Sequence, residues 1–204
     1  MRRFITALVL IIGAAAGLSA QFRYGVIAGP TLSSLEFKQD LIGVKDTWGG
    51  TAGVQGELMF PGIGFGIDLG LIYNQLGAKV NLAEKKIWAS QGYGDERLML
   101  HYIQIPIHLR FKYTRLDGLE EKIAPLVFGG PDFMLLAGHS DCKAMKYAGG
   151  YLGLTAGGGV ELWRNWQVTV SYTWGMTYAM KTRLLDDFSA RNSHWAVRVA
   201  YFFK

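Results

Sequence analysis

The segment Ile103–Tyr113 reads IQIPIHLRFKY, with an apolar or aromatic residue at every odd position. The even positions hold Gln104, Pro106, His108, Arg110 and Lys112. Because successive side chains of a β-strand point to opposite faces, this pattern predicts a strand with one apolar face and one polar face. The class of protein depends on whether the apolar face meets a protein core or lipid.

The first twenty residues bear on that choice. Arg2 and Arg3 precede the apolar run Phe4–Ala16, and small residues follow in Gly17–Ala20. This order is typical of a cleaved secretory signal peptide. An N-terminal membrane anchor is the alternative, but the run is short beside the ~20 residues of a spanning helix. We therefore predict a signal peptide over residues 1–20 and one mature domain over residues 21–204.

Composition limits the architecture of the exported chain. It holds 27 Gly, 11 Phe, 10 Tyr and 6 Trp, and Cys142 is the sole cysteine, so no internal disulfide can form. The basic residues are scattered, and we expect no nucleic-acid partner. Only helices and closed barrels satisfy their backbone hydrogen bonds inside a bilayer. Because no apolar run after residue 20 is long enough for a spanning helix, a barrel is favoured.

Alternating segments recur along the chain. We expect eight strands, near residues 22–29, 51–60, 63–74, 102–113, 123–136, 152–162, 166–175 and 195–203. The predicted fold is all-β: a single eight-stranded antiparallel up-and-down transmembrane β-barrel. Pro125 and Pro131 leave the facing of the fifth strand open, and Pro106 predicts a bulge or local break in the fourth.

The connections alternate in length. Pro61–Gly62 and Arg164–Asn165 are expected to form tight periplasmic turns, and the stretch 114–122 is long for that side. The long extracellular loops are expected over residues 31–48, 77–96, 137–149 and 179–193. Short turns at one end and long loops at the other are typical of an outer-membrane barrel.

Aromatic residues are expected to lie at the two membrane interfaces, where an amphipathic ring is most stable. The predicted interface set is Tyr73, Tyr113, Trp166, Trp174, Trp195, Tyr201 and Phe203. A soluble lipocalin-like barrel is the alternative, but its narrow interior would have to hold rows of Trp, Tyr, Ile and Phe. Bulky residues outside the wall, with Gly, Ser and Thr inside, favour a membrane barrel.

Three motifs resemble one family. YIQIPIHLRFKY (Tyr102–Tyr113), LVFGGPDFM (Leu126–Met134) and GGGVE (Gly157–Glu161) are similar to segments of the PorT-like family of small outer-membrane β-barrel proteins. The resemblance covers essentially the whole mature chain. It implies one eight-stranded outer-membrane barrel and an assembly signal at Phe203, although Lys204 follows that residue. It also implies a link to protein secretion, which a shared fold alone does not establish.

The inward positions include charged residues. We predict that Glu57, Asp68, Arg110, Glu161 and Arg198 form a salt-bridged network that plugs the lumen, because a buried charge is costly unless it is paired. Gln55, Gln104, His108 and Lys112 are expected on the same face. A proton or ion relay is the alternative interpretation of these charges.

The chain lacks a Gly-x-Ser-x-Gly elbow and a His-Glu-x-x-His pattern. His101, His139, His194 and Ser171 are read as structural or solvated, so we predict no catalytic, cofactor or metal site. The predicted function is a non-enzymatic outer-membrane protein, structural or binding through its extracellular loops, with an accessory role in secretion as one form of it. A small porin-like channel and an outer-membrane lipid-modifying enzyme are the alternatives.

The expected partners follow from this location. They are outer-membrane lipid and lipopolysaccharide, the barrel-assembly machinery during insertion, and a secretion complex or extracellular protein.

Overall fold

The computed structural model describes residues 21–38, 43–60, 64–81, 95–113, 122–140, 145–182 and 189–203. The predicted signal peptide over residues 1–20, the turn at Pro61–Gly62, Cys142 and Lys204 lie outside the described residues, as does most of the stretches 77–96 and 114–122. Within the described part of the chain, no helix is long and apolar enough to cross a membrane.

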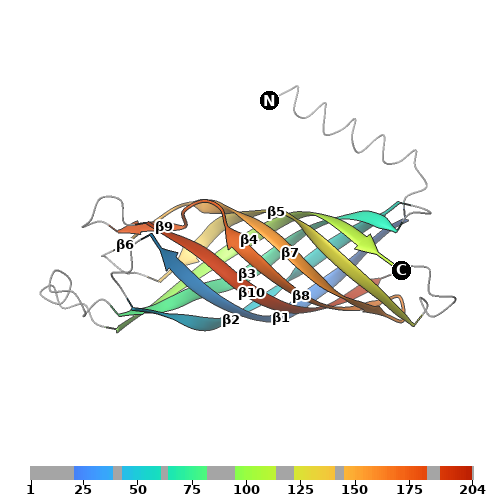
Figure 1. The fold of residues 1–204 in the computed structure, drawn as a ribbon, viewed down its shortest axis with the longest axis horizontal. Helices are drawn as coiled ribbons and strands as arrows, with labels where there is room; N and C mark the ends of the chain where they lie inside the picture. Colours follow the sequence, from blue (N-terminus) through green and yellow to red (C-terminus); the bar gives the residue numbers. More distant parts are fainter. Residues whose placement is uncertain are drawn as a thin grey trace, which may run out of the picture.

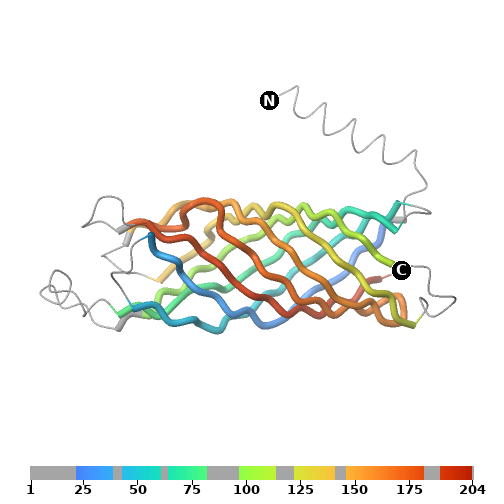
Figure 2. Tube along the Cα trace, in the orientation of Figure 1, coloured from blue at the N-terminus to red at the C-terminus, as the bar shows by residue number. Residues whose placement is uncertain are grey.

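Eight long antiparallel strands close into a barrel (Figures 1 and 2). They are β1 (Gln21–Phe37), β2 (Gly43–Met59), β3 (Phe65–Asn81), β4 (Asp95–Lys112), β5 (Ile123–His139), β7 (Gly150–Leu162), β8 (Trp166–Gly175) and β10 (Ser189–Phe203). Each pairs with the next long strand in the sequence, and β1 pairs with β10 to close the sheet. The predicted eight-stranded antiparallel barrel is confirmed.

The two ends of the barrel differ. The terminal end carries the start of β1, the end of β10 and the turns between β2 and β3, β4 and β5, and β7 and β8. The tight turn predicted near Arg164 is present, and Trp163 and Arg164 adopt positive φ values of 49° and 65° there. The loop end, at the left in Figure 1, carries β6 (Met145–Tyr147) and β9 (Met180–Thr182), which pair with each other.

The strands are longer at the loop end than the sequence suggested. The long loops expected over residues 31–48, 77–96 and 179–193 are wrong in extent, because β1 runs to Phe37, β2 starts at Gly43, β3 runs to Asn81 and β10 starts at Ser189. Likewise β5 runs to His139. Strands of 17 residues exceed the ~9–11 residues that cross a bilayer. These strands are therefore longer than a strand needs to be to cross a bilayer.

The two prolines of β5 do not interrupt its alternation. Ala124, Leu126 and Asp132 are buried inside the barrel, whereas Ile123, Val127 and Phe133 are exposed outside it. At Pro106 no bulge forms. The other form of the expectation, a local break, is present: the β3–β4 pairing stops at Leu69 and Ile107 and resumes in the same register at Ile72 and Gln104. Proline has no N–H to donate to the ladder, and no residue is inserted.

Candidate functional site

The middle of the outer wall is apolar. Its outward side chains are Val26, Val54, Leu69, Leu71, Ile107, Leu109, Val127, Phe133, Val170, Val197 and Val199, and each is at least 42% exposed. A soluble monomer rarely exposes so large a continuous apolar surface. We call this zone the belt. Its surface is the one that a hydrocarbon environment stabilises.

Aromatic side chains flank the belt at both ends. All seven predicted interface aromatics point outward from the wall: Tyr73, Tyr113, Trp166, Trp174, Trp195, Tyr201 and Phe203. Near the terminal end Trp166 packs edge-on against Tyr201, whose ring contacts Phe203. Near the loop end Tyr172 contacts both Trp174 and Trp195. These contacts place the rings in two groups separated by the length of the belt.

Beyond the loop-end aromatics the wall continues. We call this part the extension and define it as residues 33–38, 43–47, 75–81, 95–101, 136–139 and 189–194, with β6 and β9. Among the described side chains, its exposed charges are Lys38, Lys45, Lys79, Arg97, Lys146, Lys181 and Arg191 against Glu36 and Asp46. Among these described side chains seven cations stand against two carboxylates, and Asp95 and Glu96 of β4 belong to the extension by sequence. The described outer surface of the extension is polar and predominantly basic.

The lumen at the terminal end is filled by ion pairs. Arg110 contacts both Glu57, at 2.8 Å, and Asp68, at 2.7 Å. Lys112 bridges Glu57 at 2.6 Å and Glu161 at 2.8 Å. Gln167 donates hydrogen bonds of 2.8 Å to the same two glutamates. Glu57 is completely buried at the centre of this arrangement, which we call the ionic tier.

Arg23 completes the ionic tier and was missed in the sequence. Its guanidinium contacts Glu57 at 2.8 Å and also pairs with Glu161. The tier thus matches three cations, Arg23, Arg110 and Lys112, with three carboxylates. The alternation of β1 could have predicted the position of Arg23. Phe22 and Tyr24 point outward, so Arg23 between them points inward.

Arg198, the fifth member of the predicted network, lies elsewhere. Its guanidinium donates to Gln104 at 2.9 Å and approaches Asn74 at 3.4 Å, and among the described residues no carboxylate lies within ion-pair distance. The same middle level of the lumen holds Asp132, which contacts His108 at 2.9 Å and Thr155. The structure therefore brings four of the five predicted residues together and separates Arg198.

Between the ionic tier and this middle level lies a small cavity of about 10 Å³. Its lining includes Gln55, His108, Arg110, Phe128 and Arg198. That volume accommodates about one water molecule. Phe128 stacks on His108 and lies under the Arg110 guanidinium, so the space beside the cavity is filled by a ring.

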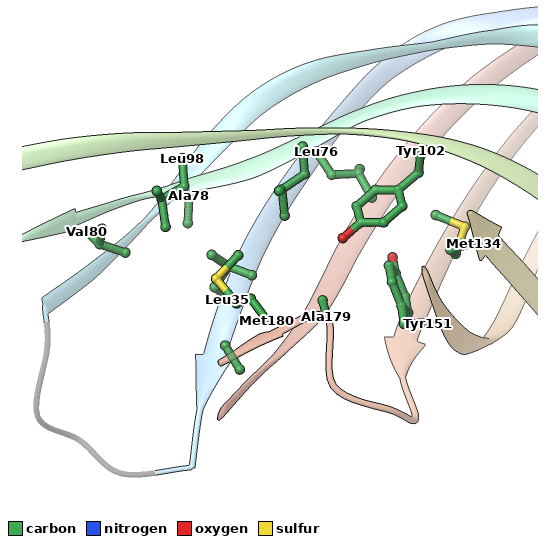
Figure 3. Packing of buried hydrophobic residues seen from close by; sticks show 12 residues of the cluster. Leu35, Leu76, Ala78, Val80, Leu98, Tyr102, Met134, Tyr151, Ala179 and Met180 are labelled. Carbon is green, nitrogen blue, oxygen red and sulfur yellow. The ribbon is translucent and has the colours of Figure 1, made fainter. Parts of the chain in front are cut away.

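An apolar cluster fills most of the lumen of the extension (Figure 3), and the polar residues Ser33, Thr47, Asn192 and His194 are buried there as well. Its buried side chains are Leu35, Leu76, Ala78, Val80, Leu98, Leu100, Tyr102, Met134, Tyr151, Ala179, Met180 and Ala190. Ala179 and Met180 come from the segment that forms β9, which pairs with β10 through Met180 and Lys181. The expectation that small and polar residues fill the lumen throughout is wrong here. We call this cluster the apolar tier.

Two phenols are buried within the apolar tier. Tyr102 and Tyr151 meet edge to face with their ring centroids 5.1 Å apart, and neither hydroxyl has a hydrogen-bond partner among the described residues. Tyr102 is completely buried and Tyr151 is 5% exposed. Large rings therefore close the lumen where the extension meets the belt.

The histidines and Ser171 are dispersed. His101 lies outside the wall, where its Nδ1 is 2.6 Å from the Tyr73 hydroxyl, whereas Ser171 is buried inside the lumen. His194 was expected beside a loop, but it lies within β10 and is 1% exposed. In the described ranges, no three His, Cys, Asp or Glu side chains group as a metal site would require.

At the rim of the extension, Arg191 lies over the ring of Tyr178, 5.3 Å from its centroid. Hydrogen bonds from Ser189 and from Arg191 lower the pKa of the exposed Tyr178 hydroxyl below its ordinary value. Arg191 is also the register partner of Glu36 across β1 and β10. In this part of the rim, the charge of Arg191 therefore faces that of an acidic residue on the neighbouring strand.

The closed barrel, its apolar belt and its filled lumen define the class of small eight-stranded β-barrels found among outer-membrane proteins. No family model matches the chain, and no curated protein matches it. Among solved structures it is similar to the outer membrane protein OprG from Pseudomonas aeruginosa, at 12% identity and a TM-score of 0.55, covering 91% of this chain and 98% of that one. This likeness shows the fold.

A second solved structure, Neisserial surface protein A, is 11% identical with a TM-score of 0.48, over 88% of this chain and 97% of that chain. A third, the attachment invasion locus protein Ail of Yersinia pestis, is 12% identical with a TM-score of 0.41, over 90% and 99%.

Proposed function

We propose that this chain is a non-enzymatic integral protein of the outer membrane, with a sealed lumen and a binding surface on its extension. The observation that carries the proposal is the double closure of the lumen, by the ionic tier and by the apolar tier. An eight-stranded barrel has an interior just wide enough for side chains to fill. A barrel filled in this way acts through its surface and not through a pore.

A solute channel is the alternative that the lumen argues against. The cavity between the two tiers measures about 10 Å³, room for about one water molecule, and its lining includes Arg110, Phe128 and Arg198. Arg110 and Tyr102, at most 1% exposed, lie on opposite sides of the middle level. Water and ions would have to displace paired charges first and then large apolar rings, and both steps are unfavourable.

Conductance across a planar bilayer tests the sealed lumen. The folded protein is added to the bilayer, and its insertion is verified by the heat-modifiable migration of protein recovered from matched vesicles. We expect no steady current steps above the lipid baseline. Stable steps from verified, inserted protein would overturn the sealed-lumen part of the proposal and favour a channel.

Labelling of intact cells tests the location and orientation. Lys181→Cys on β9 at the loop end and Lys122→Cys at the terminal end are each made in a Cys142→Ser background. A membrane-impermeant maleimide is expected to label the first variant in intact cells and the second only after lysis. Labelling of Lys122→Cys in intact cells would reverse the orientation, and labelling of neither would contradict a surface-exposed extension.

A protein partner would meet the extension first, because that end rises beyond the belt. The resemblance to the PorT-like family supports a secretion complex as one partner to test. Affinity capture from cross-linked cells, with a tag inserted in the stretch 183–188, is expected to recover secretion components if the role is accessory to secretion. Capture of lipid and assembly factors alone would favour a surface protein without that role.

A further inference from the structure

Three cations form a line across three neighbouring strands of the extension. In the antiparallel register, Lys45 of β2 is the direct partner of Lys79 of β3, and Lys79 is the direct partner of Arg97 of β4. All three side chains are exposed, and directly paired residues share one face of the sheet. We call this line the basic row.

The basic row is unfavourable without a counter-charge. Neighbouring strands lie about 4.8 Å apart, and like charges directly opposite each other destabilise a sheet. Within the described part of the chain, no carboxylate is within ion-pair distance of any member of the row. Toward the belt, the next positions of the same parity along β3 and β4 are Gly77 and Met99, which carry no charge. Toward the rim they are Asn81 and the acidic Asp95, and the row then has three cations beside one acidic position.

The geometry suits a ligand that carries several phosphates. Two ammonium groups and one guanidinium at the spacing of adjacent strands can each donate to a phosphate oxygen, and Arg97 adds a planar fork for bidentate contact. A second pair of facing lysines, Lys146 of β6 and Lys181 of β9, lies on the same end of the barrel but on a separate part of the sheet. Because these two lysines also carry positive charge, they serve as the comparison for the basic row.

The height of the basic row decides which phosphates can reach it. Lys79 lies six residues beyond Tyr73, the aromatic at the edge of the belt on the same strand. With a rise of about 3.3 Å per residue and a tilt of about 40°, this is roughly 15 Å above the interface. The headgroup layer of a phospholipid is only about 5–7 Å thick on each side. A phospholipid phosphate is therefore too low.

We infer that the basic row binds the phosphorylated saccharide of a glycolipid in the outer leaflet, at the level of its sugars. This inference rests on the proposed function, because it requires the belt to lie in the membrane and the extension to face outward. The proposed function gives the extension a binding surface without naming a ligand. The inference adds a ligand class and three contact residues to that surface.

The test compares two triple variants of equal charge. The first replaces the basic row by serine (Lys45→Ser, Lys79→Ser, Arg97→Ser), and the second replaces three other exposed cations of the same end (Lys38→Ser, Lys146→Ser, Lys181→Ser). Each folded barrel in lipid nanodiscs is titrated with phosphorylated lipopolysaccharide core oligosaccharide. Parallel titrations use the enzymatically dephosphorylated oligosaccharide, inorganic phosphate and nanodiscs containing phosphatidylglycerol.

We expect the row variant to lose affinity for the phosphorylated oligosaccharide by a factor on the order of ten, and the comparison variant by less than about threefold, because each exposed ion pair contributes modestly. The wild type should bind the dephosphorylated oligosaccharide and inorganic phosphate far more weakly. A conservative variant, Lys79→Arg with Arg97→Lys, should retain binding. Retained binding would show that the row requires its two lysines and one arginine but not the arginine at position 97.

Equal losses in the two triple variants would overturn the inference and indicate general electrostatic attraction. Undiminished binding of the dephosphorylated oligosaccharide, or an equal response to phosphatidylglycerol, would overturn it as well. Heat-modifiable migration verifies that every variant is folded. If the row variant binds normally while the barrel stays non-conducting and its loop end is labelled from outside, the inference fails and the proposed function stands.

Discussion

The belt and the extension are one continuous wall with opposite chemistry on its two faces. Along β3, the belt places Leu69 and Leu71 outside and Asp68 inside, whereas the extension places Lys79 outside and Ala78 and Val80 inside. The strand does not change its facing between the two zones. Under the proposed membrane location, what changes is the solvent outside the wall.

With the belt in the membrane, as proposed, the difference follows from where the hydrophobic effect operates. In the extension, water surrounds the wall, so burial of an apolar interior stabilises the barrel as in a soluble protein. In the belt, hydrocarbon outside is as apolar as leucine, so apolar packing inside offers little advantage over exposure. Paired charges and hydrogen bonds then hold the opposite sides of the interior together. The extension is therefore stabilised mainly by apolar packing inside the wall, and the belt mainly by ion pairs and hydrogen bonds inside it.

The largest test of this contrast removes the centre of the ionic tier. Glu57→Ala leaves Arg110, Lys112 and Arg23 with too few carboxylates inside the belt. Breaking a buried pair from one side costs about 3–5 kcal/mol, and we expect a loss of that size. Urea unfolding in phosphatidylcholine vesicles, followed by tryptophan fluorescence, measures it. Adding Lys112→Met should restore part of the loss, and an unchanged midpoint for Glu57→Ala would contradict the role of the tier.

The matching test in the extension creates a cavity. Leu98 is completely buried in the apolar tier, and Leu98→Ala is expected to lower the free energy of unfolding by about 3 kcal/mol. Met99→Ala, on the outward face of the same strand, serves as the control and should change it by less than about 1 kcal/mol. The same urea titration applies. Equal effects of the two substitutions would show that the interior of the extension is not a packed core.

A charge placed on the outer wall distinguishes the two solvents directly. Leu69 lies midway along the belt portion of β3, and Leu69→Arg is expected to cost about 2–4 kcal/mol, as for arginine near a bilayer midplane. Gln75→Arg, on the same face but in the extension, should cost about 0–1 kcal/mol. Vesicle-based unfolding of both variants checks the difference. Similar values would place the membrane boundary somewhere other than at Tyr73.

The sequence predicts only part of this contrast. The reason is that the apolar residues of a strand occupy even positions in one zone and odd positions in the other. In β4, apolar residues occupy Leu98, Leu100 and Tyr102, and then Ile103, Ile105 and Ile107. The belt half was predicted, because its apolar outward positions are unbroken. Residues 97–101 receive no assignment between the loop expected over 77–96 and the strand expected from residue 102, because the phase reversal at 102–103 resembles the end of a strand. When a strand keeps the same facing, a shift of its apolar residues from even to odd positions indicates that the surroundings of the wall change.

The ionic tier was predictable in part for the same reason. Glu57, Asp68, Arg110 and Glu161 alternate with clearly apolar neighbours, so their inward facing follows from parity. Asp132 was missed because Pro125 and Pro131 obscured the facing of β5. The alternation gives the facing of a side chain but not its height along the barrel axis. It therefore could not predict that Arg198 lies at the level of Gln104 and Asn74 and not at the level of the carboxylates.

The smallest expected effect is a gain of stability instead of a loss. In the belt, a new charge on the outer wall is expected to destabilise the barrel, whereas at Lys79 a change of charge should stabilise it. Lys79→Glu replaces a cation that faces Lys45 on one side and Arg97 on the other, and so converts two like-charge pairs into opposite-charge pairs. With no anionic ligand present, we expect a gain of about 0.2–1 kcal/mol at low salt.

Salt identifies the origin of that gain. At about 1 M salt the screening length falls to roughly 3 Å, so the advantage of Lys79→Glu over the wild type should nearly disappear. Gln75→Glu, whose register partner is His101, is the control and should show little gain at either salt concentration. Urea midpoints at both concentrations give the comparison. A loss of stability in Lys79→Glu at low salt would mean that the three cations do not repel one another, and that no anion is needed to stabilise the row.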